Sequence, residues 1–167
     1  MGTSGKKIIV KSWSYDDPIS YITNIDIAQY QVKFSEKLST SRIRPDIASK
    51  LGQVVLENKL KFLVFSADWC KDSQEVLPLL AKIYQVTKIP MKILGGIKKN
   101  LNPPPSWKVP PSPPEVLEYN VEKLPCILVL DKGSCEIARV YEQPPPGKSL
   151  EKHLLEVIEE YLDIEEK

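Results

Sequence analysis

Residues 60–87 read LKFLVFSADWCKDSQEVLPLLAKIYQVT, and two apolar patterns follow one another within this stretch. Residues 60–67 form an apolar run of strand length, which is typical of a strand that is buried on both faces. From Cys70 to Thr87 the apolar residues recur at helical spacing, which predicts an amphipathic helix, and Pro78 is expected to kink it. The stretch therefore predicts a buried strand that runs into a helix, with Cys70 at the turn between them.

Three further strands are predicted later in the chain, at 91–96, 126–131 and 135–142. The last two are separated by Lys132, Gly133 and Ser134, a turn short enough to pair them as an antiparallel hairpin. A strand that returns to the sheet through a helix pairs in parallel with the strand before it. An amphipathic helix, capped by Ser149, is predicted at 149–162. This order predicts an α/β fold with a mixed central sheet and helices on both of its faces.

The first part of the chain is predicted to be an N-terminal extension, residues 1–59, which packs on or precedes a main domain of residues 60–167. Residues 44–59 have a clear helical period. Residues 17–38 are ambiguous between helix and strand, and we favour a helix. A short apolar run at 6–11 indicates an edge strand. The extension is therefore expected to be mainly helical.

A proline-rich loop insertion is predicted at 97–114, which holds seven of the 15 prolines of the chain. Proline lacks an amide hydrogen and fixes φ, so this loop is expected to be stiff and extended. Trp107 is interpreted as an anchor that fixes the loop to the domain, and a lid or a partner contact is the alternative. A short helix is predicted directly after the loop, at 114–121.

The composition excludes several classes of protein. The 167 residues include 23 basic and 22 acidic residues, a net charge of +1, which gives no electrostatic indication of binding to nucleic acid or to an anionic membrane. No apolar run is long enough to span a bilayer, and the N-terminus lacks the apolar core of a secretory signal. The three cysteines lack the paired spacing of a metal site and fit free thiols in a reducing compartment. We therefore predict a cytoplasmic protein with no metal, no nucleic-acid partner and no membrane partner.

The turn at Cys70 resembles the active site of the thioredoxin fold. Trp69 and Cys70 stand where that family has its Trp-Cys pair, and Pro78 stands where the family has a helix-kinking proline. The resemblance covers roughly residues 60–162, and its motifs occur in the family's order. The W-C-x-D-S pattern is similar to that of a monothiol thioredoxin-like subgroup.

The second half of the resemblance lies in residues 119–140, which are similar to the thioredoxin segment with the cis-proline loop and the final hairpin. It places the cis peptide bond at Leu124-Pro125. Two positions depart from the family: the second cysteine of C-x-x-C is Ser73, and Val64 replaces the buried acid that many thioredoxins carry on the preceding strand. One of the two thiols of the ordinary dithiol cycle is therefore missing.

The chemistry of Cys70 is expected to follow from its place at a helix N-terminus, where the free amides and the helix dipole stabilise a thiolate. Ser73, one turn further on, is expected to donate a hydrogen bond to the sulfur. Lys71 favours the anion and Asp72 opposes it. Asp72 is either a proton acceptor beside the thiol or simply an acid that complements the helix dipole. The alternative to a reactive Cys70 is a relic thiol in a binding domain.

The other two cysteines are weaker candidates. Cys126 follows Pro125, and the resemblance places the cis-proline near Cys70, so Cys126 is a possible resolving thiol. The alternative is a buried structural thiol at the start of a strand. Cys135, on the second hairpin strand, is interpreted as structural, and His153 as a surface residue.

The resemblance implies thiol–disulfide exchange on disulfide-bearing proteins or low-molecular-weight disulfides, through a mixed disulfide at Cys70 that a second thiol such as glutathione would release. Trp69, Leu124 and Pro125 are the expected substrate-binding residues, and no cofactor is implied. The alternative is a redox-silent thioredoxin-like protein-binding module. A monothiol glutaredoxin with an iron–sulfur cluster fits less well, because the chain has no C-G-F-S motif.

Overall fold

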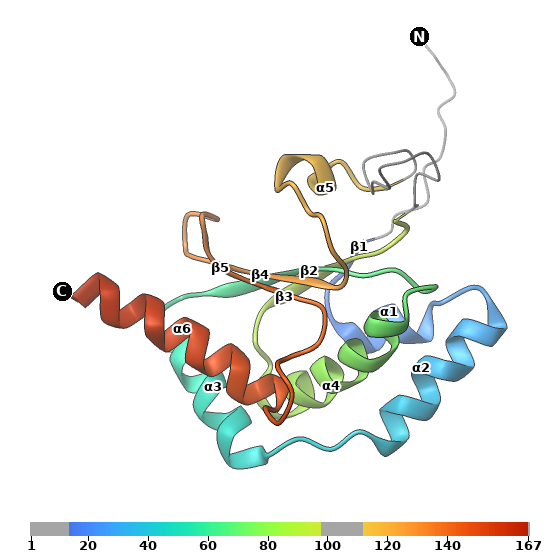
Figure 1. Ribbon diagram of the computed structural model, residues 1–167, viewed down its shortest axis with the longest axis horizontal. Coiled ribbons are helices and arrows are strands. Elements are labelled where there is room, and N and C mark those ends of the chain that lie inside the picture. The colour runs from blue at the N-terminus through green and yellow to red at the C-terminus, as the bar shows by residue number, and fades with distance from the viewer. Residues whose placement is uncertain (1–13, 98–111, 167) are drawn as a thin grey trace, which may run out of the picture.

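The computed structural model describes residues 14–97 and 112–166 (Figure 1). At its centre is a five-stranded sheet with the strand order β1-β3-β2-β4-β5. The strands are β1 Ser14–Tyr15, β2 Lys61–Phe65, β3 Met91–Leu94, β4 Cys126–Leu130 and β5 Glu136–Tyr141. The predicted edge strand at 6–11, Trp107 and residues 98–111 of the predicted insertion lie outside the described residues.

The strand pairing confirms the mixed sheet. Strands β2 and β3 are parallel, whereas β4 is antiparallel to both β2 and β5. The β4–β5 hairpin turns where predicted, and the Asp131 carboxylate closes the turn by accepting hydrogen bonds from the amides of Gly133 and Cys135, both at 2.9 Å. Strand β1, which pairs antiparallel with β3 at the edge of the sheet, was not predicted from the sequence.

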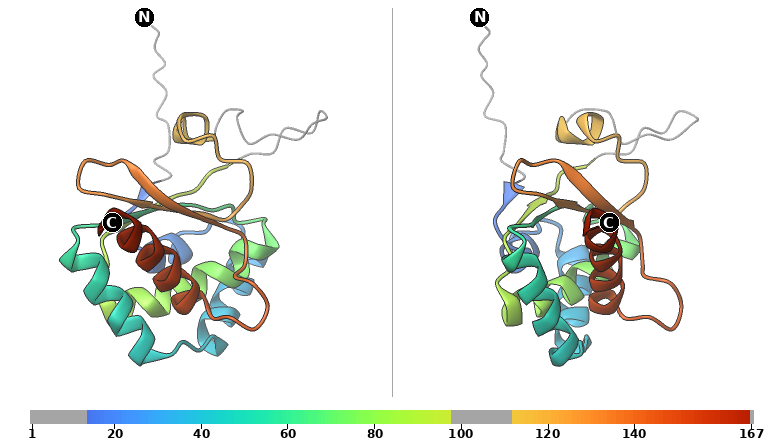
Figure 2. Two further views of the ribbon diagram at one scale, coloured as in Figure 1. Left: turned by 60° about the vertical axis from the view of Figure 1, so that its left-hand side comes forward. Right: turned by 90° about the vertical axis from the view of Figure 1, so that its left-hand side faces the viewer.

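The described residues form six helices: α1 Pro18–Thr23, α2 Ala28–Thr40, α3 Pro45–Glu57, α4 Lys71–Thr87, α5 Glu115–Glu118 and α6 Leu150–Glu166. Five of them lie on one side of the sheet, here called the helix face, and only α5 lies on the other, here called the α5 face (Figure 2). Helices on both faces are thus confirmed, but the division is very unequal. None of these helices has the length and apolar character that a bilayer span requires.

The described part of the N-terminal extension, residues 14–59, is mainly helical and contributes to the core of the molecule. The helix predicted at 17–38 is two helices, α1 and α2, which a turn separates. Asp17 caps α1, since its carboxylate accepts a hydrogen bond from the Ser20 amide at 2.7 Å. Both helices contact α4, and Phe34 of α2 is fully buried in the same cluster as the central strands. The division between extension and domain at residue 59 stays a prediction.

The helix face holds the larger core. Alternate residues of the strands point into it, among them Phe62, Val64, Ile93, Ile127 and Val129. Helices α3 and α4 approach each other closely at Gly52, where an added β-carbon would lie 2.9 Å from the Thr87 side chain. A side chain at position 52 would therefore force these two helices apart.

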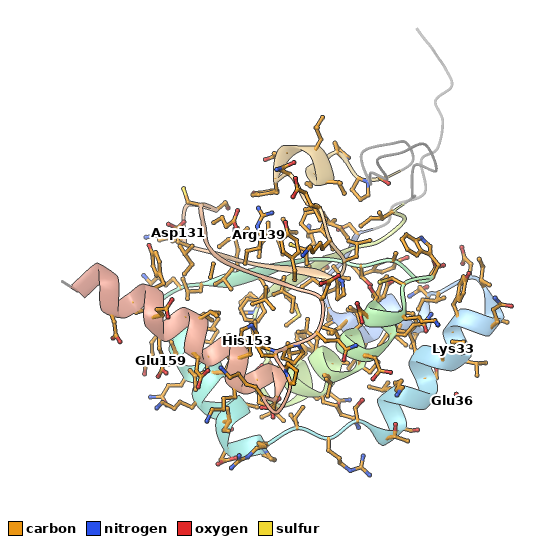
Figure 3. The ribbon with its side chains drawn as sticks, viewed as in Figure 1. Lys33, Glu36, Asp131, Arg139, His153 and Glu159 are labelled. Atoms are coloured by element: carbon orange, nitrogen blue, oxygen red, sulfur yellow. The ribbon has the colours of Figure 1, made fainter. Side chains whose placement is uncertain are left out.

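Among the described residues, far fewer cover the α5 face than the helix face. Its strand residues include Leu63, Phe65, Cys126 and Leu128, and Val116 and Val121 pack over them. Arg139 of β5 ties this cover to the sheet: its guanidinium donates hydrogen bonds to the carbonyls of Tyr119 at 2.7 Å and Asn120 at 3.2 Å (Figure 3 labels Arg139). Its ion pair with Glu136, at 2.7 Å, raises the pKa of the guanidinium above its usual value. Arg139 therefore adds a polar clamp to the apolar packing of Val116 and Val121.

Candidate functional site

Cys70 lies at the turn between β2 and α4, where it is the N-terminal capping residue of the helix. Its amide donates to the carbonyl of Ala67 at 3.2 Å, and its carbonyl accepts the first helical hydrogen bond, from the Gln74 amide at 3.0 Å. The side chain is half-buried. Cys70 therefore lies at the positive end of the helix dipole, with part of its surface exposed.

The loop before β4 lies against this thiol. The Leu124–Pro125 peptide bond is cis, and the Leu124 carbonyl accepts a hydrogen bond from the Cys70 sulfur at 3.7 Å. The Pro125 carbonyl accepts one from the Glu142 amide at 2.8 Å, which ties the loop to the end of β5. Leu124 and Pro125 are themselves buried. The structure thus brings together Cys70 and the two loop residues that the sequence predicted beside it.

Ser73 is fully buried one turn into α4. Its hydroxyl oxygen accepts a hydrogen bond from the Ala67 amide at 3.4 Å. The side chain therefore braces the turn that carries Cys70. A hydrogen bond from Ser73 to the Cys70 sulfur stays a prediction.

Asp72 is held by a residue that is distant in the sequence. Its carboxylate accepts a hydrogen bond from the Gln143 side chain at 2.7 Å, and Gln143 lies in the segment between β5 and α6. This contact joins the first turn of α4 to that segment. Both interpretations of Asp72, as a proton acceptor and as a partner of the helix dipole, stay open.

Trp69 is half-buried beside Cys70, and its indole N–H donates to the carbonyl of Ile97 at 3.0 Å. This hydrogen bond fixes the ring against the segment that follows β3. The same side chain lines two cavities, one on the side of the N-terminal extension and one between α2 and α4. Contact between Trp69 and a substrate stays a prediction.

All three cysteines are free in the structure. Cys126 is fully buried on the α5 face, between Phe65 and Tyr141 on the neighbouring strands, and burial raises the pKa of its thiol to about 12. A thiol that stays protonated is a slow nucleophile, so these surroundings work against the predicted resolving role without testing it. Cys135 was interpreted as structural, but its side chain is exposed beside the hairpin turn.

His153 was interpreted as a surface residue, but it is half-buried on α6. Burial lowers the pKa of its imidazole below the usual value, and the nearby Lys148 ammonium lowers it further. Its helix carries the predicted cap, because the Lys152 amide donates to the Ser149 hydroxyl at 3.3 Å.

Three parts of this region were not found from the sequence: the Asp72–Gln143 contact, the Arg139 clamp, and the cavity that the extension forms beside Trp69. Each joins residues that are far apart in the chain, and none of them carries a local motif. Periodicity and turn signals describe neighbours in sequence, so they contain no information about these pairings.

Comparison with known proteins supports the fold. A family model described as thioredoxin matches residues 26–101, which is less than half of the chain and begins inside the predicted extension. No curated protein matches the chain. With the sheet order, the hairpin and the α4 turn described above, this match defines a thioredoxin-like fold.

Two solved structures are similar over most of the chain. A Pseudomonas aeruginosa protein of unknown function is 19% identical with a TM-score of 0.54, over 90% of this chain and 92% of that one. An HIV epitope-scaffold is 18% identical with a TM-score of 0.51, over 90% of this chain and 93% of that one. A DsbH oxidoreductase reaches a TM-score of 0.43 at 16% identity, over 75% and 93% of the two chains, too low to support an argument. At these identities the likeness concerns the fold alone.

Proposed function

We propose that this chain carries out thiol–disulfide exchange on disulfide-bearing proteins or low-molecular-weight disulfides, as a monothiol C-x-x-S protein. The observation that carries the proposal is the position of Cys70: a half-exposed thiol at the N-terminus of α4, in contact with the carbonyl that precedes the cis bond of Pro125. Thiol reactivity requires access, which the half-exposed side chain gives, and we propose that the free amides at the N-terminus of α4 favour attack by this sulfur.

The proposed reaction has two exchange steps. The Cys70 thiolate attacks one sulfur of the substrate disulfide; a bond forms between these sulfurs, the substrate disulfide breaks, and the second substrate sulfur leaves as a thiolate that takes a proton from water. A second thiolate, such as that of glutathione, then attacks the substrate sulfur of the mixed disulfide and releases Cys70. Another glutathione reduces the resulting substrate–glutathione disulfide, and glutathione disulfide is the oxidised product.

The neighbours of Cys70 have distinct proposed roles. Ser73 braces the turn and stabilises the thiolate, and Trp69 shields one side of it. Leu124 and Pro125 shape the groove for an extended substrate. We propose that the backbone of this loop pairs with the backbone of a bound strand. The three free cysteines suit a reducing compartment, and we propose a cytoplasmic location.

One observation favours a redox-silent binding module instead. The contact between the Cys70 sulfur and the Leu124 carbonyl, at 3.7 Å, uses the proton of the thiol, and it is lost when the thiol ionises. In that alternative Cys70 does not react with disulfides, and the region around it serves only to hold a partner.

The alkylation rate of each cysteine separates the two functions. The full chain is treated with iodoacetamide between pH 6 and 9, and each cysteine peptide is quantified by mass spectrometry. Cys135 serves as the internal reference because its side chain is exposed, while Cys126, with a pKa of about 12, is expected to react slowest. For an activated nucleophile we expect Cys70 to react about tenfold faster than Cys135 near neutral pH. If Cys70 reacts no faster than Cys135, the exchange function fails and the binding module remains.

A further inference from the structure

A cavity of about 410 Å³ lies between the N-terminal extension and the turn that carries Trp69. The residues that line it include the aromatic residues Tyr15, Tyr21, Tyr30 and Trp69 and the acidic residues Asp26 and Asp68. Its volume lies within the range of small-ligand sites. The extension supplies four of these six residues, so the cavity exists only because the extension packs here.

The aromatic walls are held in place by other contacts. Tyr15 meets Tyr21 edge to face, with ring centroids 5.7 Å apart, and Tyr21 meets Phe34 in the same way at 5.8 Å. The Tyr21 hydroxyl accepts a hydrogen bond from the buried Ser66 hydroxyl at 2.9 Å. Trp69 is fixed by its hydrogen bond to Ile97. A site with walls that are already ordered loses little conformational entropy when a ligand binds.

Among the described residues that line the cavity, two are acidic, and none is a lysine, an arginine or a histidine. Asp26 and Asp68 also interact elsewhere in the chain. A carboxylate has about four lone-pair sites and can accept more than one hydrogen bond. Aromatic faces beside carboxylates attract an organic cation through the ring quadrupole and through charge.

A second cavity shows that this charge is local. It measures about 330 Å³, shares Tyr30 and Trp69 with the first, and is lined by three lysines, Lys33, Lys37 and Lys71, as well as by two acids. Figure 3 shows Lys33 on α2, at the end of the molecule opposite Glu159. The second cavity therefore contains basic residues. Of these two cavities, the one that the extension forms is better suited to a cation.

We infer that this cavity binds the arginine or lysine side chain of a partner, close to the half-cystine that the partner presents to Cys70. Only the second part of this inference, that the partner presents a half-cystine to Cys70, rests on the proposed function. Trp69 lines the cavity and directly precedes Cys70, so their α-carbons are about 3.8 Å apart. A partner that reaches the thiol therefore has its neighbouring residues within reach of the cavity. Arginine suits the site best, since its planar guanidinium stacks on aromatic faces.

The test uses blocked six-residue peptides in matched pairs. Each peptide contains one cysteine, protected as a disulfide with 2-mercaptoethanol, and either arginine or its uncharged isostere citrulline within three residues of that cysteine. Binding to the full chain with Cys70→Ser, which cannot form the mixed disulfide, is followed by tryptophan fluorescence. We expect arginine peptides to bind about tenfold more tightly than citrulline peptides, as for a partly desolvated cation on aromatic rings.

The variants Asp26→Asn and Tyr30→Leu, each made in the Cys70→Ser background, are expected to remove most of this preference. Glu159→Gln removes one negative charge at the opposite end of the molecule and is expected to leave the preference unchanged (Figure 3). Asp26 is exposed in the turn before α2, so its substitution remains informative even if Tyr30→Leu unfolds the chain. Equal affinity for the two peptides, or a preference that both variants retain, would overturn the inference.

The same peptides report separately on the proposed function. With the unmodified chain, attack by Cys70 expels 2-mercaptoethanol as a thiolate and leaves a peptide adduct that mass spectrometry detects. If neither peptide forms an adduct while the arginine preference persists in the Cys70→Ser variant, the exchange function fails and the cation site stands. If both peptides react at the same rate and bind equally, the exchange function stands and the cation site fails.

Discussion

The two faces of the sheet are covered in opposite ways. On the helix face, five helices bury a continuous apolar cluster that reaches from Phe34 in the extension to Ile158 in α6. On the α5 face, one turn of helix and the segment after it cover a smaller cluster, and Arg139 holds that cover by hydrogen bonds to two carbonyls. Burial of many side chains is cooperative, whereas a single polar clamp can open without unfolding the rest. We therefore expect a stiff face and a face that opens locally.

Cys70 lies where these two faces meet. Its helix, α4, belongs to the helix face, but the Cys70 side chain packs against the apolar cluster of the α5 face. The thiol is thus fixed from one side and covered from the other by the thinner layer. Local opening of the α5 face is therefore expected to increase access to the Cys70 thiol, in addition to its effect on stability.

The strongest test of the stiff face is Phe34→Ala. Phe34 is fully buried, and its removal is expected to lower the free energy of unfolding by about 3–5 kcal/mol, through lost transfer energy and the cavity left behind. Urea unfolding measures the change. Val32→Ala, on the exposed side of the same helix, is the matched control and should change stability by less than about 0.5 kcal/mol. Similar small effects from both variants would mean that α2 is not part of the cooperative core.

The corresponding test of the α5 face is Arg139→Gln. It is expected to lower the free energy of unfolding by about 1–3 kcal/mol, because two carbonyls and the Glu136 carboxylate lose their donor. Hydrogen exchange should quicken in α5 and in the following residues to 121, and alkylation of Cys126 beneath them should become faster.

The control for this test is Arg42→Gln. Arg42 also donates to two backbone carbonyls, those of Ser39 and Ser41, but it is exposed in the connection between α2 and α3. It should leave exchange at α5 unchanged. Unchanged exchange at α5 in Arg139→Gln itself would show that the clamp is not what holds this cover.

A smaller change in the free energy of unfolding is expected from Tyr21→Phe. This variant tests how much the polar contacts of the helix face contribute to stability. The substitution leaves the buried Ser66 hydroxyl without its partner and should lower the free energy of unfolding by about 1–2 kcal/mol. The double variant with Ser66→Ala should be less destabilised than the sum of the single variants, because the unpaired group is then removed. Additive effects would mean that the two hydroxyls contribute independently.

The smallest effect concerns His153 and pH. Burial and the Lys148 ammonium hold the pKa of the folded imidazole below its usual value, so the unfolded chain binds this proton more readily. Stability should therefore decline as pH falls through the usual value of about 6.5. Urea unfolding at pH 7.5 and pH 5.5 should show a steeper decline for the native chain than for His153→Gln. An equal decline in stability for the two proteins would show that His153 does not contribute to the pH dependence.

Local patterns were sufficient for much of the fold. The apolar run at β2, the helical period of α4 and the tight hairpin each predicted an element that the structure contains. The placement of Cys70 beside Leu124 and Pro125 also followed, because the resemblance carried both segments together.

The arrangement of the helices did not follow from the sequence. A helical period shows that a helix has an apolar stripe, but it does not say which face of the sheet receives the stripe, so the stacking of α3, α4 and α6 on one face was not predicted. The break between α1 and α2 was missed because the residues between them include Ile25 and Ile27, which continue the apolar pattern. The contact of Asp72 with Gln143 spans 71 positions and has no local signal.

Gly52 gives a criterion for reading other sequences. Thr87 cannot easily move aside for a β-carbon there, because its hydroxyl donates to the Ile83 carbonyl at 2.8 Å and accepts from the Ile89 amide at 3.2 Å. In a chain that has the W-C-x-D-S motif but a larger residue at this position, α3 must lie further from α4, which is the helix that carries the cysteine at its N-terminus. In a set of candidate relatives, this glycine would sort the chains that share the present helix packing from those that share only the motif.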